Sequence, residues 1–401
     1  MFSLQEQQKR SVIRMEEMAI TTLGKKQILF GCESVYQLFN AIILRMTVCA
    51  ENDCDIILSN ITTWQKDMLQ RLEEAKVFRK VFCPDTHALE YDFWPLANED
   101  KKKVYRNPVL FFHNDPPVEP VYDELFFSID HLFWKMIYYY HIVSNKEPII
   151  NMYDEGVRAY TMELFNTENK FYSKEAYSQS FPSAIKRYYL WQPALYAVPK
   201  YTYALLPIQL PEEDNSVKET LLQVFGYEKL PEEECIYLED FFFADHYITN
   251  DFSLFRQVAE IVGRDNIIVK RHPRDQYDRF TANGYKTVAN SVVPWEIQLL
   301  ANDMNDKFLV SVSSTSILTP YMIFNSPIHV ISLENMFFGD NPTHGDKAYN
   351  NFISSLKNKV NEKEIHIHAP HNADELLETI RYIRLKQHLG FTEEKGETIH
   401  E

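Results

Sequence analysis

The feature that most constrains the fold is a repeated alternation of short apolar runs with longer stretches whose apolar residues have helical spacing. The predicted strands lie at residues 27–30, 55–58, 81–83, 109–112, 149–153, 236–238, 267–269, 308–312, 328–332 and 364–368. The predicted helices lie at residues 35–48, 64–74, 132–143, 253–262, 294–300, 317–324 and 373–385. Strands that alternate with helices are typical of βαβ units, in which the sheet is parallel.

The alternation loosens between residues 186 and 232, where prolines and acidic runs punctuate the chain. Such a segment is typical of a connection between domains. The predicted division is a Rossmann-like domain at 1–190, a linker at 191–232, a second Rossmann-like domain at 233–385 and a polar tail at 386–401. Two consecutive α/β domains that face a central cleft form the GT-B arrangement of many nucleotide-sugar transferases. By this pattern alone, other two-domain α/β folds stay open.

Charge and cysteine usage narrow the class of protein. The chain has 41 Lys and Arg against 57 Asp and Glu, a net charge of −16, which argues against a general nucleic-acid binder. Its 5 cysteines are irregularly spaced and form no CxxC pair, so we expect reduced thiols in a cytoplasmic protein and no zinc site. No apolar run is long enough to span a bilayer. Peripheral contact with the inner face of a membrane and assembly into a homodimer both stay open.

An acidic pair follows the predicted strand at 149–153. Asp154 and Glu155 stand at its carboxyl end, where ligands bind in open α/β sheets, and Gly156 lets the backbone turn sharply. One carboxylate in this position can act as a general base towards a substrate hydroxyl. The alternative is an acidic turn that caps the next helix through the helix dipole.

A basic cluster follows the predicted strand at 267–269. Lys270, Arg271, His272 and Arg274 supply four cationic or potentially cationic groups within five residues, which indicates a phosphate-bearing ligand. His272 can donate a proton or a hydrogen bond to a leaving phosphate. If the strand continues through Lys270 and Arg271, they point to opposite sides, and at most one of them joins the site. The alternative is a solvated loop that ends a strand.

A run of hydroxyls precedes the predicted helix at 317–324. Ser313, Ser314, Thr315 and Ser316 can cap this helix, and its orphan N–H groups together with its dipole would favour an anion. Plain capping without a ligand is the alternative. A Ser-His-Asp triad is disfavoured because no GxSxG motif occurs, and neither GxGxxG nor a P-loop is present.

Three of these motifs together resemble a known group of enzymes. YDEG (153–156), KRHPRD (270–275) and SVSSTS (311–316) are similar, in this order, to the acidic-acidic-Gly, His-Pro and Ser-Ser motifs of bacterial sialyltransferases. Both lipooligosaccharide sialyltransferases and capsular polysialyltransferases carry the three motifs. IKRYYLWQP (185–193) resembles the end of their first domain, and GCESVYQLFNAI (31–42) resembles their first strand-to-helix turn.

The resemblance implies a role for each motif. Glu155 or Asp154 would be the base that activates the acceptor, and His272 would act on the CMP leaving group. The domain at 1–190 would therefore bind the acceptor, and the domain at 233–385 would bind the CMP-sugar donor. Asp251, in the first loop of the second domain, is a rival base. The remaining substrate-binding candidates are Lys270, Arg274, Ser313, Ser314, Thr315, Gly31, Ser34, Gln37 and Gly156.

The predicted function is therefore an inverting sialyltransferase that moves sialic acid from CMP-sialic acid to a hydroxyl of a glycan acceptor. No cofactor and no metal are expected, because the cationic side chains can offset the phosphate charge and no DxD-type motif stands at a strand end. Two alternatives stay open. One is another GT-B transferase, such as a CDP-glycerol-dependent teichoic-acid polymerase or a Kdo transferase. The other is a non-catalytic capsule-assembly or sugar-binding protein.

Overall fold

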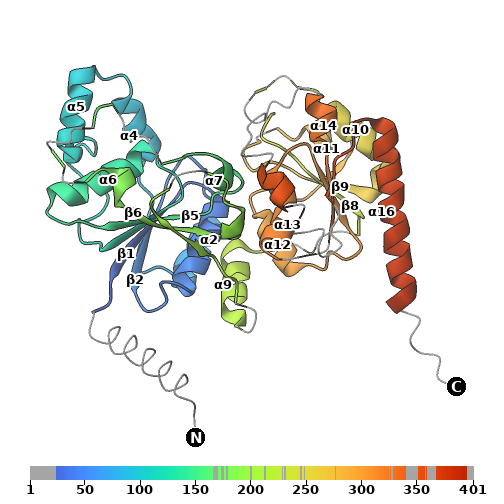
Figure 1. The fold of residues 1–401 in the computed structure, drawn as a ribbon, viewed down its shortest axis with the longest axis horizontal. Helices are drawn as coiled ribbons and strands as arrows, with labels where there is room; N and C mark the ends of the chain where they lie inside the picture. The colour runs from blue at the N-terminus through green and yellow to red at the C-terminus, as the bar shows by residue number, and fades with distance from the viewer. Residues whose placement is uncertain are drawn as a thin grey trace, which may run out of the picture.

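In a computed structural model the chain forms two α/β domains side by side (Figure 1). The structure describes residues 24–394 except 166–169, 173–175, 178, 199–200, 212–213, 228, 230–231, 244–245, 248, 276, 325, 327, 340–350, 357 and 359–366. In the described residues each domain has one sheet whose strand pairs are all parallel. The predicted class, two Rossmann-like domains with parallel sheets facing a central cleft, is confirmed.

The first domain contains a seven-stranded sheet, as far as the chain is described, in the order β3-β2-β1-β4-β5-β6-β7. Its strands are β1 (Gln27–Cys32), β2 (Asp53–Leu58), β3 (Val81–Phe82), β4 (Glu124–Phe127), β5 (Ile149–Tyr153), β6 (Ile185–Leu190) and β7 (Ala204–Pro207). Its helices are α2 (Val35–Met46), α3 (Lys66–Ala75), α4 (Thr86–Phe93), α5 (Asn98–Arg106), α6 (Leu132–Val143), α7 (Arg158–Thr161), α8 (Phe181–Ala184) and α9 (Asn215–Phe225), with 3₁₀ turns η1 (Pro108–Leu110) and η2 (Pro193–Leu195).

The second domain contains a six-stranded sheet, within the described ranges, in the order β10-β9-β8-β11-β12-β13. Its strands are β8 (Cys235–Leu238), β9 (Ile267–Lys270), β10 (Lys286–Thr287), β11 (Phe308–Ser311), β12 (His329–Ser332) and β13 (Ile367–His368). Its helices are α10 (Asp251–Val262), α11 (Arg279–Ala282), α12 (Trp295–Ala301), α13 (Thr319–Met322), α14 (Glu334–Phe338) and α16 (Ala373–Glu394), with 3₁₀ turns η3 (Arg264–Asn266) and η4 (Thr315–Ile317).

Apolar residues on both faces of the central strands explain the layered packing. In β1, Ile28 and Phe30 pack on the side covered by α2, α3 and α9, whereas Leu29 packs on the side covered by α6. Successive strand residues point to opposite faces, so a parallel sheet covered by helices on both sides needs continuous apolar strands. In the second domain, α10 and α16 cover one face of the sheet.

One predicted strand is wrong. Residues 109–112 belong to η1 and the turn after it, and the fourth strand is β4, which the sequence pattern missed. Phe111 and Phe112 are buried against Phe133 of α6, so the apolar run serves a core-facing turn. A short apolar run alone does not distinguish the two cases. The missed strand begins with Glu124, a buried acid that pairs with Lys26 at 2.6 Å.

The segment predicted as a linker carries regular structure. Strand β7 pairs with β6 and ends at Pro207, which an edge strand tolerates because its outer side needs no partner. Helix α9 contacts α2 and α3 of the first domain and α12 of the second. The side chain of Gln192 also donates to the carbonyl of Met322 at 2.7 Å. Residues 191–232 thus join the two domains through packed contacts.

In the predicted tail, α16 continues to Glu394, and the rest of the tail lies outside the described residues.

The strand orders define where a ligand can bind. The sequence order of strands reverses between β1 and β4 in the first sheet and between β8 and β11 in the second. In open α/β sheets, ligands bind outside the carboxyl ends of the strands at such a switch point. A ligand site is therefore expected at the loops that follow these four strands.

Candidate active site

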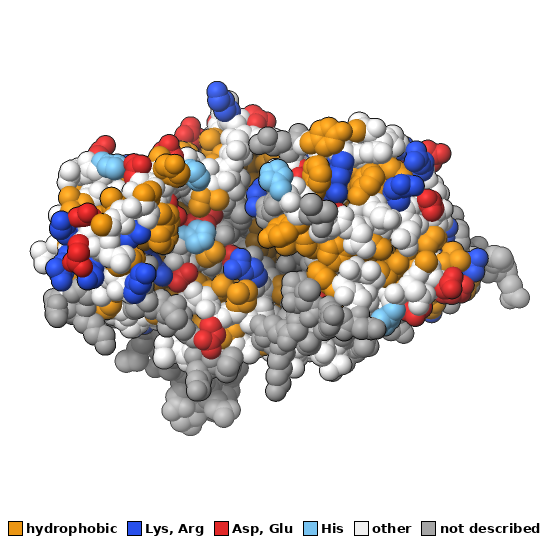
Figure 2. All heavy atoms as spheres, turned by 90° about the horizontal axis from the view of Figure 1, so that it is seen from above, with side chains coloured by type: hydrophobic (Ala, Val, Ile, Leu, Met, Phe, Trp, Pro, Cys, Tyr) orange, Lys and Arg blue, Asp and Glu red, His pale blue; other side chains and the backbone are white. Residues whose placement is uncertain are grey.

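A cleft of about 980 Å³ lies between the two domains and contains most of the motifs singled out in the sequence. Its first-domain wall comes from the loops after β1, β2, β4 and β5, and its second-domain wall from the segments after β8, β9, β10 and β11. Histidine, Lys and Arg side chains are visible near the middle of the molecule, where the two domains meet (Figure 2). Both switch points thus open into the same cleft.

Glu155 is the predicted acidic group on the first-domain wall. It follows β5, lines the cleft, and its Oε1 atom is buried without a hydrogen-bond partner among the described residues. The pKa of Glu155 is raised to about 7, mainly by burial; the charge of Arg158 acts to lower this pKa, and the charge of Asp154 acts to raise it. A carboxyl group with a pKa near 7 suits a general base. It accepts a proton more readily than an ordinary carboxylate does, and much of it is still deprotonated at neutral pH.

Asp154, its neighbour, has a structural position. The side chain is completely buried and does not line the cleft. Its carboxylate accepts four hydrogen bonds, from Tyr36 Oη (3.0 Å), the Gly156 N–H (2.8 Å), Tyr160 Oη (2.5 Å) and the Trp191 N–H (3.3 Å). A carboxylate with this many donors has no lone pair directed at a substrate. Of the two candidate bases, the geometry leaves Glu155 facing the cleft and uses Asp154 to hold the turn.

Three other first-domain candidates have different surroundings. Gly31 is buried, and a Cβ there would lie 2.6 Å from a ring carbon of Trp134, so this glycine makes room for a core side chain. Ser34 lines the cleft, but its hydroxyl caps α2 by accepting the Gln37 N–H at 3.2 Å. The Gln37 side chain in turn accepts the Glu33 N–H at 2.6 Å. Ser34 and Gln37 therefore fix the first loop of the cleft wall.

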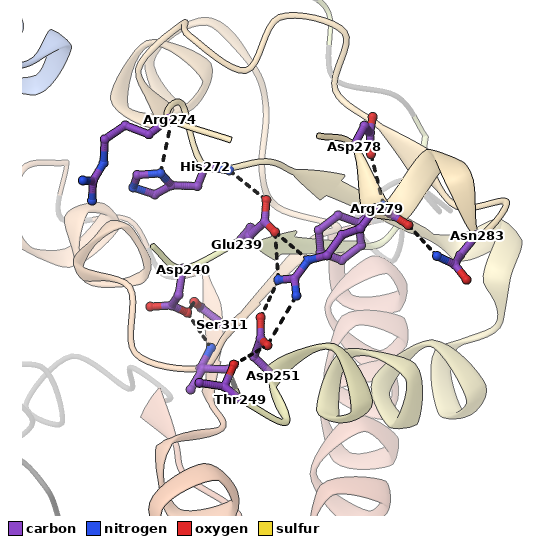
Figure 3. A network of polar contacts seen from close by, with 12 residues as sticks. Glu239, Asp240, Thr249, Asp251, His272, Arg274, Asp278, Arg279, Asn283 and Ser311 are labelled. Atoms are coloured by element: carbon purple, nitrogen blue, oxygen red, sulfur yellow. Dashed lines mark hydrogen bonds and ion pairs between the residues drawn. The ribbon is translucent and has the colours of Figure 1, made fainter. Parts of the chain in front are cut away.

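His272 is the central basic group of the opposite wall. Its backbone N–H donates to Glu239 Oε2 at 3.1 Å, and its Nδ1 accepts the Arg274 N–H at 3.3 Å. Because Nδ1 accepts, the neutral ring carries its proton on Nε2. Figure 3 shows the imidazole and the Arg274 side chain extending to the same side, away from Glu239. Both residues line the cleft.

The two cations before His272 have different partners. Lys270 is buried, lines the cleft and donates to the Ser291 carbonyl. Arg271 forms an ion pair with Asp278, 3.3 Å from Nε to Oδ2. Arg271 lines the cleft as well, so both cations stand in its wall. Strand β9 ends at Lys270, and the alternation expected if the strand continued through Arg271 therefore does not apply.

The loop at residues 311–316 (the Ser-rich loop) differs in part from the prediction. Ser314, Thr315 and Ser316 line the cleft, whereas the hydroxyl and N–H of Ser313 both donate to the buried Asp240, at 3.1 and 3.2 Å. The helix predicted at 317–324 is also wrong in extent. It is replaced by η4 and the four-residue α13, where Pro320 lacks the N–H that a continuous helix ladder requires. The expected long helix, with its dipole directed at the cleft, is therefore not formed at this loop.

Asp251, the rival base, is removed from the cleft. It is buried at the start of α10, where its carboxylate forms an ion pair with Arg279 and accepts the Thr249 hydroxyl at 2.7 Å. Burial would raise its pKa, but the hydrogen bond and charge of Arg279 outweigh burial, and the pKa of Asp251 is lowered. A weakly basic carboxylate that is already paired is poorly suited to deprotonate a hydroxyl.

The sequence analysis did not identify several acidic residues at or near the cleft. Glu239 and Asp240 follow β8, and an acidic pair at a strand end is the signal that singled out Asp154 and Glu155. Glu296, at the start of α12, lines the cleft, and burial raises its pKa to about 7. No strand-end pattern marks it. Glu33 lines the cleft as well and pairs with His131 at 2.6 Å.

Within the described ranges, no three His, Cys, Asp or Glu side chains are grouped closely enough to hold a metal ion. Of the helices that the structure describes, none combines the length and the apolar character needed to cross a bilayer.

Comparisons with known proteins give structural similarity only. No protein-family model matches the chain, and a comparison of its sequence with curated proteins gives no match. The structure is similar to an α/β-galactoside α-2,3-sialyltransferase from Photobacterium phosphoreum, with a TM-score of 0.46 and 11% identity over 86% of this chain and 99% of the other. It is also similar to the UDP-GlcNAc 2-epimerase of Methanocaldococcus jannaschii, with a TM-score of 0.45 and 12% identity over 90% and 92% of the two chains.

The UDP-GlcNAc 2-epimerase of Neisseria meningitidis is a third similar structure, with a TM-score of 0.39 and 10% identity over 90% of this chain and 100% of the other. These similar proteins include a transferase and epimerases, and every TM-score is below 0.5. The likeness therefore does not distinguish between activities, and we base the assignment of function on the residues of the cleft.

Proposed function

We propose that the chain is a sialyltransferase that transfers sialic acid from CMP-sialic acid to a hydroxyl group of a glycan acceptor, with inversion. The observation that carries this proposal is that Glu155 and His272 line opposite walls of one cleft, each at the carboxyl end of a parallel strand. A base on one wall and a phosphate-binding cluster on the other are the two groups that such a transfer requires. The three motifs that resemble those of bacterial sialyltransferases supply these residues and support this choice of donor.

The first-domain wall would bind the acceptor. Its hydroxyl would attack the anomeric carbon while its proton passes to the carboxylate of Glu155, whose pKa of about 7 leaves much of it charged at neutral pH. General base catalysis of this kind contributes about 10²–10⁴ to the rate. The hydrogen bonds around Asp154 hold the turn that presents Glu155, so the base would not have to be reorganised during the reaction.

The second-domain wall would bind the donor phosphate. In CMP-sialic acid the phosphate is bonded directly to the anomeric carbon, so negative charge develops on its oxygen as the bond breaks. His272 would donate to that oxygen from Nε2, and Arg274 and Lys270 would offset the charge of CMP. Groups that are already in position stabilise developing charge well, because they need no reorganisation at the moment of reaction. Ser314 and Thr315 would supply hydroxyl donors to the same phosphate.

The positions of these groups also support inversion. A base and a leaving-group cluster on opposite walls favour attack on the face of the sugar opposite to the departing phosphate. The acceptor hydroxyl forms the new bond as the bond to CMP breaks, and a single displacement of this kind inverts the anomeric centre.

The first experiment is a nucleotide preference measured by calorimetry with CMP, CDP, UDP and GDP, combined with release of CMP from CMP-sialic acid. The proposal expects tightest binding of CMP and donor hydrolysis that is lost in Glu155→Gln or His272→Ala. Preference for CDP with turnover of CDP-glycerol would indicate the teichoic-acid polymerase alternative, and release of CMP from CMP-Kdo would indicate a Kdo transferase. If no nucleotide binds and both variants retain cellular function, the protein is a non-catalytic sugar-binding or assembly protein.

A further inference from the structure

The acidic pair Glu239-Asp240 occupies the switch point of the second sheet. The two residues follow β8, which lies between β9 and β11, the strands that lead into the His272 loop and the Ser-rich loop. Both side chains are buried. Buried carboxylates are unfavourable unless donors or cations compensate them, so their partners show what each carboxylate does.

Glu239 holds the loop of His272. One carboxylate oxygen accepts the His272 N–H at 3.1 Å, and the other accepts from Arg279 Nε at 3.0 Å (Figure 3). Burial raises the pKa of Glu239, as does the adjacent Asp275 carboxyl, whereas Arg279 lowers it. The contact to a backbone N–H fixes where the loop leaves β9, and with it the point from which the imidazole extends.

Arg279 anchors this arrangement from behind. Its guanidinium contacts both Glu239, at 2.8 Å, and Asp251, so one cation bridges two buried carboxylates. The guanidinium also lies 4.5 Å from the ring centre of Phe243, a cation–π distance. Asp251 is thus linked to the His272 backbone through Arg279 and Glu239.

Asp240 holds the Ser-rich loop in the same way. Its carboxylate accepts four hydrogen bonds from three consecutive residues: Ser311 Oγ (2.7 Å), the Val312 N–H (3.2 Å), the Ser313 N–H (3.2 Å) and Ser313 Oγ (3.1 Å). Burial raises the pKa of Asp240, and the hydrogen bonds from the serines partly offset this effect, so that the resulting pKa is about 6. The carboxylate is therefore mainly charged at neutral pH. These donors determine the path that places Ser314 on the cleft.

We propose that Glu239 and Asp240 are paired positioning residues for the donor site, Glu239 for the His272 loop and Asp240 for the Ser311–Ser316 loop. Because the two carboxylates are adjacent on one strand end, they set the spacing between the two loops proposed to grip the donor phosphate. Asp240 does not line the cleft, and Glu239 does, but both Glu239 carboxylate oxygens already accept from the His272 N–H and from Arg279, so their role is to hold the loops rather than to bind the donor. The inference rests on the proposed function for its kinetic consequences, but the ordering of the loops can be measured without any substrate.

The kinetic experiment uses double-mutant cycles on hydrolysis of CMP-sialic acid. Glu239→Gln leaves one acceptor oxygen for two donors, and we expect kcat to fall about 10-fold with KM changed by less than about 3-fold. In the His272→Ala background the same change should have little further effect, because residues that act through one group are not additive. A full further 10-fold loss in that background would overturn the role of Glu239.

The matching cycle concerns the other loop. Asp240→Ala is expected to weaken CMP binding about 10-fold or more in the otherwise native chain, and to have little effect in the Ser314→Ala background. Ser311→Ala removes the shortest of the same hydrogen bonds from the opposite side, so it replaces Asp240→Ala if that variant does not fold. Additive losses with Ser314→Ala, from either variant, would contradict the role of Asp240.

Hydrogen–deuterium exchange of the protein without ligand separates this inference from the proposed function. Glu239→Gln should speed exchange in peptides covering 270–275 but not 311–316, and Asp240→Ala should do the reverse. Glu378→Ala, which removes an exposed carboxylate paired with Arg381 at 2.8 Å, is the control and should change neither. Unchanged exchange in both variants would overturn the inference, whereas a native chain that binds no CMP but shows the expected exchange would overturn only the proposed function.

Discussion

Gly156 of the first domain lies directly against Thr315 of the second. A Cβ built on Gly156 would lie 3.3 Å from Thr315 Cγ2, closer than side chains normally approach, and the φ angle of this glycine is +106°. The end of the acidic motif therefore packs against the Ser-rich loop across the cleft. This contact brings together two motifs that lie far apart in the sequence. A larger side chain at position 156 or 315 would push the two walls of the cleft apart.

Gly156→Ala should lower the free energy of unfolding by about 1 kcal/mol or more, because alanine is strained at positive φ. It should also reduce donor hydrolysis, because the added methyl group pushes the Ser-rich loop away. Gly284→Ala is the matched control, since Gly284 has φ +77° and its nearest neighbour would lie 3.7 Å from a Cβ. We expect similar destabilisation in urea unfolding but normal activity for the control. Equal activity of the two variants would show that the contact with Thr315 does not matter.

His272→Ala should reduce kcat for hydrolysis of CMP-sialic acid by about 100-fold, because it removes the donor to the leaving phosphate. The fold should be preserved, since the contact that anchors the loop to Glu239 comes from the backbone N–H. His371→Ala, which removes an exposed histidine paired with Glu375 on α16, serves as the control. Steady-state kinetics and thermal unfolding of both variants provide the measurement, and near-normal turnover of His272→Ala would exclude the leaving-group role.

The pH dependence of the reaction should report Glu155. A base is active only when deprotonated, so kcat/KM should fall as the pH drops through about 7, the pKa to which burial raises this carboxyl group. Glu155→Gln should remove this limb of the profile together with most of the activity. A limb near pH 4 in the native enzyme would instead indicate an unperturbed carboxylate as the base.

The same shift has a consequence for stability. A carboxyl group whose pKa is raised from 4.5 to about 7 on folding binds more protons in the folded state, so its contribution to stability is lost as the pH rises through this window. Glu155→Gln should therefore stabilise the protein at pH 8 by about 1–3 kcal/mol, and by much less at pH 5. Urea unfolding at the two pH values tests the sign, and equal effects at both would contradict the burial of a charge.

Ser313 and Ser314 should differ in the effect of replacement by alanine. Ser314 lines the cleft and its hydroxyl accepts the Ser316 N–H at 3.3 Å, so Ser314→Ala should weaken CMP binding about 10-fold and lower the free energy of unfolding by at most about 1 kcal/mol. Ser313 donates twice to Asp240, once from its hydroxyl, so Ser313→Ala should reduce the free energy of unfolding by about 1 kcal/mol and weaken CMP binding less than Ser314→Ala does. Calorimetry with CMP compares the two variants, and urea unfolding checks that both are folded. If Ser313→Ala weakens CMP binding more than Ser314→Ala, the donor contacts are assigned to the wrong serine.

The sequence predicted the parallel α/β domains because periodic apolar runs report burial directly. It failed at residues 109–112 and at β4, where local polarity was misleading: an apolar turn faces the core, and a strand begins with the buried, paired Glu124. The strand-end rule also placed Glu155 and His272 on one cleft. It could not distinguish Glu155 from Asp154, because the difference depends on donors from Tyr36, Tyr160 and Trp191 that are remote in sequence.

The outer strands of both sheets affect how the protein behaves at high concentration. In the described residues β3 and β10 each contain 2 residues, and β7, the other outer strand of the first sheet, has 4 and ends in Pro207. An outer strand offers unpaired N–H and C=O groups to other chains, and short strands and proline limit this offer. These three edges therefore present little template for intermolecular β-pairing, which lowers the tendency of the protein to aggregate during expression and storage.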